Sequence, residues 1–239
     1  MNSFKPHMEI LSEVQKQIWP ALGWTKTNGF VLYGGTAIAL WCGHRASIDF
    51  DFFTDRQLNH KLIHQDLQKS GIIPHVVQDE KNSLTLFTEP GNVKLSFFGD
   101  LGMGRVGAPA QTDDDIVTVA SPLDLLGTKL KVIMQRAEAK DYIDIAQLLR
   151  DGSSLIQGLG AARSMYGSAF APAESLRALT FFDDGDLARV NAKTRQELRI
   201  EAARASQMFP IAKIDIVSKQ LSVEGIVRQV NRDRGGMEL

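Results

Sequence analysis

The hydrophobic pattern of this chain changes period once, near Ser121, and that change limits the folds open to it. Before it, short apolar runs alternate with glycine turns and helical segments, a pattern typical of a mixed sheet with flanking helices. After it, apolar residues recur at helical spacing. The sequence therefore predicts an α+β fold, with an α/β lobe over residues 1–120 and a helical lobe over residues 121–239.

Local patterns predict the elements of each lobe. Strands are expected at residues 30–33, 48–53, 72–77, 84–88, 93–98 and 116–119, with helices at 7–19, 36–41 and 56–70. In the second lobe helices are expected at 122–137, 141–150, 153–166, 173–181, 187–208 and 217–231. The signal at Ser121 is the clearest of these, since it combines an N-cap serine, a proline and an acid three residues after the cap.

Charge and cysteine content narrow the class of protein. The 239 residues include 27 Lys and Arg against 28 Asp and Glu, a net charge of −1, which argues against binding nucleic acid through bulk positive charge. Cys42 is the only cysteine, so an intrachain disulfide framework and a CxxC-type zinc ribbon are excluded. No signal-peptide core or membrane-length apolar run is evident, and a cytoplasmic location without membrane association is expected.

The first motif with chemical content is Gly34-Gly35-Thr36, followed by Asp49-Phe50-Asp51. In a strand, alternate side chains share a face, so both carboxylates point the same way. Paired carboxylates suit hard cations such as Mg²⁺, and a glycine turn that opens a helix offers backbone N–H groups to phosphate. The alternative is an exposed edge strand with two solvated aspartates after an ordinary glycine turn.

The second motif is a polar stripe on an apolar helical stretch, formed by Lys129, Arg136, Lys140 and Asp144. A straight helix would separate Lys129 from Asp144 by about 22 Å, too far for one site. A break near residues 139–140 is therefore predicted, after which the second helix folds back on the first. The stripe favours an anion site, and the alternative is a solvated helix face.

Together the stretches GGTAIALWCGHRASIDFDFF and DLLGTKLKVIMQRAEAKDYIDIAQLL resemble the AbiEii/AbiGii toxin group of nucleotidyltransferases, within the DNA polymerase β-like superfamily. The resemblance covers most of residues 28–150 and extends weakly to SLRALTFFDD at 175–184. It implies a nucleotidyltransferase-like mixed sheet joined to a helical lobe, with the active site between them.

The resemblance also implies roles for particular residues. Nucleotide binding would fall to Gly34, Gly35, Thr36, Arg45 and Lys129. The catalytic set would be Asp49, Asp51, Lys129 and Asp144. Within it, Asp49 and Asp51 would bind Mg²⁺ or Mn²⁺, Lys129 would contact phosphate, and Asp144 would act as the base or orient the acceptor.

One position departs from the superfamily pattern. A third carboxylate often stands on a later strand, and the corresponding stretch here, residues 93–98, offers Ser96 instead. Three outcomes remain open: a single tightly held Mg²⁺, a third ligand from elsewhere such as Asp100, or a weakened or lost activity.

The predicted function is Mg²⁺-dependent transfer of a nucleotide from NTP, with release of pyrophosphate, to an acceptor such as tRNA or another RNA. The resemblance implies a toxin that is paired with a cognate antitoxin. Two alternatives remain: a nucleotidyltransferase-fold interaction module with little or no activity, which Ser96 makes plausible, and a nucleotidyltransferase that acts on small molecules.

Overall fold

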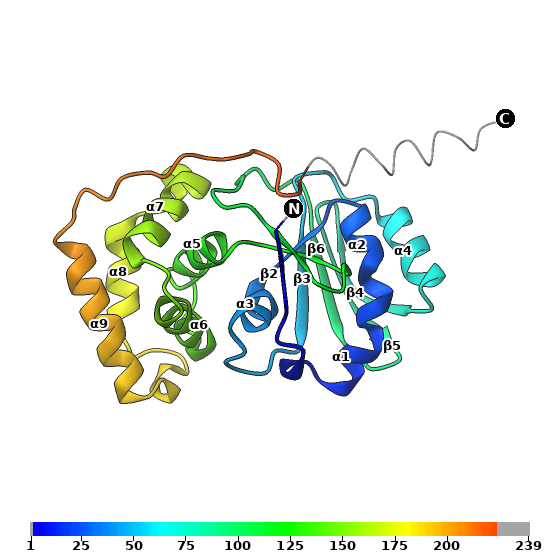
Figure 1. The fold of residues 1–239 in the computed structure, drawn as a ribbon, viewed down its shortest axis with the longest axis horizontal. Coiled ribbons are helices and arrows are strands. Elements are labelled where there is room, and N and C mark those ends of the chain that lie inside the picture. The colour runs from blue at the N-terminus through cyan, green and yellow to red at the C-terminus, as the bar shows by residue number, and fades with distance from the viewer. Residues whose placement is uncertain (1, 224–239) are drawn as a thin grey trace. The chain divides into compact units, whose positions relative to one another are not determined.

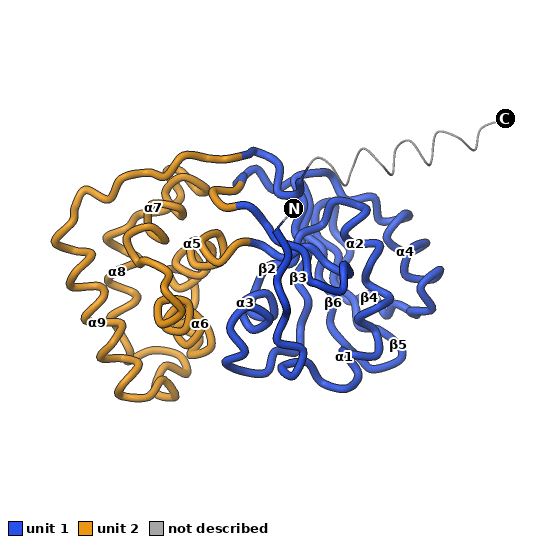
Figure 2. Tube along the Cα trace, in the orientation of Figure 1, with its two compact units in different colours: residues 1–104, 108–120, 218–239 blue, residues 105–107, 121–217 orange. Residues whose placement is uncertain are grey.

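The computed structural model describes residues 2–223, which divide into two units (Figure 2). Unit 1 contains the chain up to residue 104, residues 108–120 and the chain from 218 onward, and unit 2 contains residues 105–107 and 121–217. The chain crosses from one unit to the other between residues 104 and 105, 107 and 108, 120 and 121, and 217 and 218. That the two units are separate domains stays a prediction.

Unit 1 contains all the strands of the described chain and the first helices (Figure 1). The strands are β1 Ser3–Phe4, β2 Val31–Tyr33, β3 Asp49–Phe53, β4 Ile73–Glu80, β5 Ser83–Glu89, β6 Lys94–Phe98, β7 Ala110–Thr112 and β8 Thr118–Val119. The helices are η1 Met8–Ile10, α1 Glu13–Ile18, η2 Trp19–Leu22, α2 Gly23–Thr27, α3 Gly34–Cys42 and α4 His60–Lys69, where η marks a 3₁₀ turn.

Over residues 2–223 the strands form one eight-stranded sheet in the order β1-β7-β8-β2-β3-β6-β5-β4. Strand β3 lies at its centre, antiparallel to β2 and parallel to β6. Strands β6, β5 and β4 follow as an antiparallel meander. The mixture of parallel and antiparallel pairs, with flanking helices, confirms the predicted fold class.

One face of the central strands is the core of unit 1. Phe50 and Phe52 of β3 are 0% exposed, as is Phe97 of β6. Trp19 lies against Phe50 and Trp24 against Phe97, with ring centroids 5.9 Å and 5.5 Å apart. The short helices of residues 13–27 therefore cover this face (Figure 1), and the opposite face of β3 is left to carry the two aspartates.

Unit 2 is helical. Its elements are α5 Pro122–Val132, α6 Ala139–Arg150, α7 Leu155–Tyr166, η3 Gly167–Ala169, α8 Pro172–Thr180, η4 Leu187–Arg189 and α9 Ala192–Ser206. Helices α5 and α7 pack closely because glycines stand at their contact. A Cβ on Gly158 would lie 2.6 Å from Leu126 Cγ, and one on Gly127 would lie 3.2 Å from the backbone N of Ala162.

Several predicted helices differ in extent from those observed, mostly because N-cap residues divide them. The helix predicted over 7–19 is interrupted at Ser12, whose side chain forms a capping box with Gln15 and starts α1. Asn59 likewise delays α4 relative to the predicted 56–70. Asn191 separates η4 from α9 inside the predicted 187–208.

Two further helix predictions are wrong in part. The helix predicted over 122–137 ends at Val132, because the chain turns before Glu138, which is extended. The helix predicted over 217–231 is absent from 217–223, and its remainder lies outside the described residues. There the backbone bonds to other segments instead: the Val217 N–H donates to the Arg105 carbonyl at 2.9 Å, and the Leu221 N–H to Asp55 Oδ1 at 3.0 Å.

Strands β1 and β7 and helix α2 were not expected from the sequence; they span two, three and five residues, too few to show a period. None of the helices within residues 2–223 is both long enough and apolar enough to cross a membrane.

Candidate active site

The glycine turn lies where the centre of the sheet meets a helix. Strand β2 ends at Tyr33 and α3 begins at Gly34, whose φ of +75° is a left-handed conformation that glycine adopts without strain. Tyr33, the N-cap residue, is extended, and no side chain caps the first turn of α3. The first N–H groups of this nine-residue helix therefore lack a side-chain cap at the positive end of the helix dipole.

Because Gly34 and Gly35 have no side chains, side chains from other segments lie directly against this turn. A Cβ on Gly34 would collide with the Asp51 carboxylate, whose Cγ would lie 3.3 Å from it. A Cβ on Gly35 would collide with the Arg45 guanidinium. The turn thus has an acidic and a basic side chain directly against its backbone, which the sequence pattern alone did not indicate.

Thr36 is buried and only 1% exposed. Its hydroxyl lies 2.7 Å from the Ser47 hydroxyl and donates to the main-chain carbonyl of Asp49. Thr36 thereby joins the first turn of α3 to the start of β3. Its predicted place among the nucleotide-binding residues stays a prediction, and only its backbone N–H remains suited to that role, since its side chain is occupied within the fold.

The alternation predicted for β3 is confirmed. Asp49 and Asp51 lie on one face, and Phe50 and Phe52 on the other are fully buried. The Asp49 side chain is 36% exposed, and the Lys94 ammonium lies 3.7 Å from its carboxylate. The pair is therefore accessible, and Lys94 offsets part of its negative charge.

Ser96 occupies the position opposite Asp51 in the β3–β6 register. It is 2% exposed. Asp100, one of the predicted sources of a third ligand, instead accepts a hydrogen bond from Asn82 at 3.1 Å. Within residues 2–223 no cluster of three or more His, Cys, Asp or Glu is placed to hold a metal ion, so Asp100 does not complete a three-carboxylate site.

The predicted fold-back in unit 2 is confirmed. Helix α5 ends at Val132 and α6 begins at Ala139. The Lys129 ammonium on α5 lies 2.8 Å from Asp144 Oδ2 and 2.6 Å from Asp141 Oδ1, both on α6. A continuous helix could not bring these groups together.

Two members of the predicted stripe, Lys129 and Asp144, lie in the interior of unit 2, whereas the side chains of Arg136 and Lys140 are 45% and 52% exposed, so the solvated-face alternative is wrong for Lys129. Lys129 is 5% exposed, and Asp141 and Asp144 are each 0% exposed. Arg136 donates to both oxygens of Asp141, at 2.9 Å and 3.3 Å. Burial alone would raise the pKa of Asp141, but Lys129 and Arg136 hold it below its usual value.

Asp141 had no predicted functional role. It connects the two cations of this cluster, Lys129 and Arg136. Its spacing of three residues from Asp144 places both carboxylates on one face of α6, and that spacing was the available signal. The assigned roles of Lys129 and Asp144 stay predictions.

Asp124, in the first turn of α5, also binds the backbone of a distant segment. Its carboxylate is 1% exposed and accepts the N–H groups of Val106 and Gly107 at 2.9 Å and 3.1 Å. It thereby holds the segment 105–107 to unit 2. Burial raises the pKa of Asp124 to about 6, although these hydrogen bonds and the one with Ser121 act in the opposite direction.

This shift predicts a pH dependence of stability. Because the folded pKa of about 6 lies above the ordinary 3.8, the stabilising contribution is complete below about pH 4 and is lost as pH rises through 6. Asp124→Asn retains an acceptor oxygen but does not titrate. Urea unfolding between pH 4 and 7 should show that the free energy of unfolding of wild type falls by about 3 kcal/mol relative to that of Asp124→Asn. A constant difference across this range would contradict the assignment.

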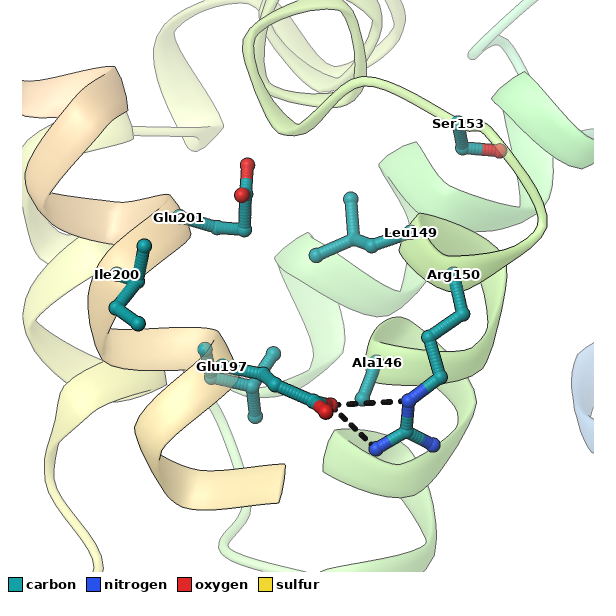
Figure 3. A pocket seen from close by; sticks show the side chains of 8 residues that line it. Ala146, Leu149, Arg150, Ser153, Glu197, Ile200 and Glu201 are labelled. Atoms are coloured by element: carbon teal, nitrogen blue, oxygen red, sulfur yellow. Dashed lines mark hydrogen bonds and ion pairs between the residues drawn. The ribbon is translucent and has the colours of Figure 1, made fainter. Parts of the chain in front are cut away.

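A pocket of about 370 Å³ lies in unit 2 between α6 and α9 (Figure 3). Apolar and charged residues both line it, and among the charged ones Arg150 donates to Glu197 at 2.9 Å and 2.5 Å. Its lining is Ala146, Leu149, Arg150, Ser153, Glu197, Leu198, Ile200 and Glu201. None of the predicted site residues lines it, so this pocket is separate from the Lys129 cluster.

Comparison with known proteins assigns the chain to a family. Residues 25–215 match the family described as "Nucleotidyl transferase AbiEii toxin, Type IV TA system". Over 125 residues the chain is 30% identical to an uncharacterized protein of Aquifex aeolicus (strain VF5), an alignment that covers 52% of this chain and 59% of that protein. The chain thus spans about three fifths of that relative's length.

The crystal structure of the Megavirus polyadenylate synthase aligns with 57% of this chain and 31% of that chain, at a TM-score of 0.44 and 14% identity. This likeness is too small to establish the fold or the function by itself. The family match, in contrast, spans most of the 239 residues. The chain belongs to the AbiEii nucleotidyl transferase toxin family of type IV toxin–antitoxin systems.

Proposed function

We propose that this protein transfers a nucleotidyl group from NTP to an acceptor hydroxyl and releases pyrophosphate. One observation carries the proposal: the Asp51 carboxylate lies directly against Gly34, where α3 begins without a side-chain cap. Oxygen ligands for a cation therefore adjoin backbone N–H groups suited to phosphate. This arrangement lies within unit 1.

The carboxylates of Asp49 and Asp51 fit one Mg²⁺ or Mn²⁺ ion. Both offer hard oxygen donors on one strand face, and Mg²⁺ is commonly held by one or two carboxylates together with substrate phosphates. When bound, the ion neutralises charge on the triphosphate and lowers the pKa of the attacking group. Ser96 in place of a third carboxylate makes a single ion the better fit.

In the proposed reaction an acceptor oxygen attacks the α-phosphorus of NTP. A phosphorus–oxygen bond to the acceptor forms, the bond from the α-phosphorus to the bridging oxygen breaks, and pyrophosphate leaves. The N–H groups of Gly34 and Gly35 and the Arg45 guanidinium orient the triphosphate. The proton of the acceptor hydroxyl passes to solvent.

Lys129, the predicted phosphate contact, belongs to unit 2, where two carboxylates hold it. Asp141 and Asp144 fix its ammonium at 2.6 Å and 2.8 Å. Asp144 is fully buried and paired with this lysine, which supports a positioning role for it over that of a base.

Family membership supports a toxin role with a cognate antitoxin as partner, and we propose RNA, such as tRNA, as the acceptor. The catalysis proposed here would take place in the cytoplasm. Ser96 lies opposite Asp51 in place of a third carboxylate, which favours one competing function, an interaction module with little or no turnover.

Labelled NTPs with Mg²⁺, supplied together with total RNA, cell protein and small acceptors, would test the proposal. We expect label in RNA with wild type and none with Asp51→Asn. Label in protein would redirect the proposal to protein nucleotidylation, and label in small molecules to the small-molecule class. No label with either Mg²⁺ or Mn²⁺ would favour the interaction module.

A further inference from the structure

The sheet face that carries Asp51 also carries aromatic rings. Phe53 follows Asp51 by two residues on β3, so its side chain points to the same face. Phe98 is the partner of Phe53 in the parallel β3–β6 register. Both rings are half-buried, whereas Phe52 on the opposite face is 0% exposed. We call Phe53 and Phe98 the aromatic shelf.

The orientation of the shelf is fixed by a buried neighbour. Phe53 stacks on Tyr33, with ring centroids 4.7 Å apart and planes 13° from parallel. Tyr33 is 1% exposed. Phe98 meets Phe53 edge to face, with centroids 5.3 Å apart and planes at 79°. The shelf is therefore a preorganised pair of rings at the surface of unit 1.

The shelf is also correctly spaced from the carboxylates. Three cross-strand pairs succeed one another along β3 and β6: Asp49 with Lys94, Asp51 with Ser96, and Phe53 with Phe98. Two residues of strand place Phe53 about 7 Å along from Asp51. In a nucleotide one sugar separates phosphate from base, so a substrate with a phosphate at Asp51 can place a base over the shelf.

We propose that the aromatic shelf is a nucleobase subsite, on which a base of the substrate stacks while its phosphate lies beside Asp51. The proposal rests on the proposed function and extends it from phosphate binding to base binding. Stacking on aromatic rings accepts any base, because every base has a π-face. The base belongs either to the NTP or to the end of the RNA acceptor.

The surroundings favour a nucleobase over an apolar segment of a partner protein. Polar groups continue along the same face: Asp51 and Ser96 lie next to the shelf, followed by Asp49 and Lys94, whose side chains are 36% and 37% exposed. An apolar protein surface laid over them would desolvate these charges without compensation. A nucleotide covers the rings with its base and meets the polar groups with its sugar and phosphate.

Fluorescence of 2-aminopurine, which falls on stacking, tests the subsite without turnover. Two probes separate the sources: α,β-methylene 2-aminopurine riboside triphosphate, and a short single-stranded RNA that ends in 2-aminopurine. We expect one of them to be quenched by wild type, with affinity about tenfold weaker in Phe98→Leu. Phe98→Trp should keep the affinity, and its indole should be quenched by ordinary nucleotide.

Phe87→Leu is the matched control, because Phe87 is half-buried on the same face but pairs with Lys94 rather than lying beside Phe53. Its affinity should equal that of wild type. Quenching by the triphosphate assigns the subsite to the donor base, and quenching by the RNA assigns it to the acceptor. Equal affinity in every variant, or no quenching by wild type, overturns the subsite. Transfer activity that survives in Phe98→Leu with unchanged KM overturns it as well, while the proposed function stands.

Discussion

Asp51→Asn is expected to lose nucleotidyl transfer by about a thousandfold or more, because removal of one carboxylate weakens a metal contribution of about 4 kcal/mol to the transition state. The loss should arise without unfolding. Asp49 and Asp51 share one strand face, so neutralising one relieves their repulsion when no cation is bound. In EDTA the variant should therefore melt at the same temperature as wild type or higher.

Added Mg²⁺ should change the stability of wild type but not that of Asp51→Asn. At tenfold excess over Kd it should stabilise wild type by about 1.4 kcal/mol and leave Asp51→Asn nearly unchanged. Thermal melting with and without Mg²⁺ measures both shifts. Asp100→Asn is the matched control, since this carboxylate is exposed, follows β6 and bonds to Asn82. It should respond to Mg²⁺ as wild type does.

Equal Mg²⁺ shifts in wild type and Asp51→Asn would show that these carboxylates are not the cation ligands. The solvated edge strand considered from the sequence predicts that outcome. That alternative also assumed that the two aspartates lie on an edge strand, whereas β3 is a central strand of the sheet.

The strand features of the site were predictable because they are local. The alternation of Asp49, Phe50 and Asp51 has the period of a strand, and that period alone places the two carboxylates on one face. The glycine turn could be predicted for the same reason, because its signal lies in adjacent residues. The approach of Arg45 to Gly35 was not, because it depends on how the chain after α3 returns to β3.

The burial of Lys129 was missed for a tertiary reason. On α5 alone it continues a polar stripe, and the sequence cannot show that α6 brings two carboxylates against it. The fold-back could be inferred because a straight helix was geometrically incompatible with a shared site. Whether the stripe then faced solvent or the interior depended on packing within unit 2, which periodicity does not specify.

Lys129→Met is expected to destabilise the protein by about 3–5 kcal/mol, the cost of removing one partner from a buried ion pair. Lys129 is 5% exposed, and its loss would leave Asp141 and Asp144 fully buried without the cation that both contact, while Arg136 stays bonded to Asp141. Urea unfolding measures the change through the midpoint at constant slope. Lys140→Met is the matched control: Lys140 pairs with Glu138 at 2.8 Å with half of its side chain exposed, and its loss should cost less than about 1 kcal/mol.

A double variant distinguishes an uncompensated charge from lost packing. Lys129→Met with Asp144→Leu removes both members of one pair and fills their volume with apolar groups, leaving Asp141 bonded to Arg136. Since neighbouring charges are coupled, the double variant should be more stable than the sum of the two single losses predicts. Additive losses would attribute the effect to packing alone. A Lys129→Met protein within about 0.5 kcal/mol of wild type would instead mean that this lysine behaves as a surface residue, and the buried cluster would not contribute to the stability of unit 2.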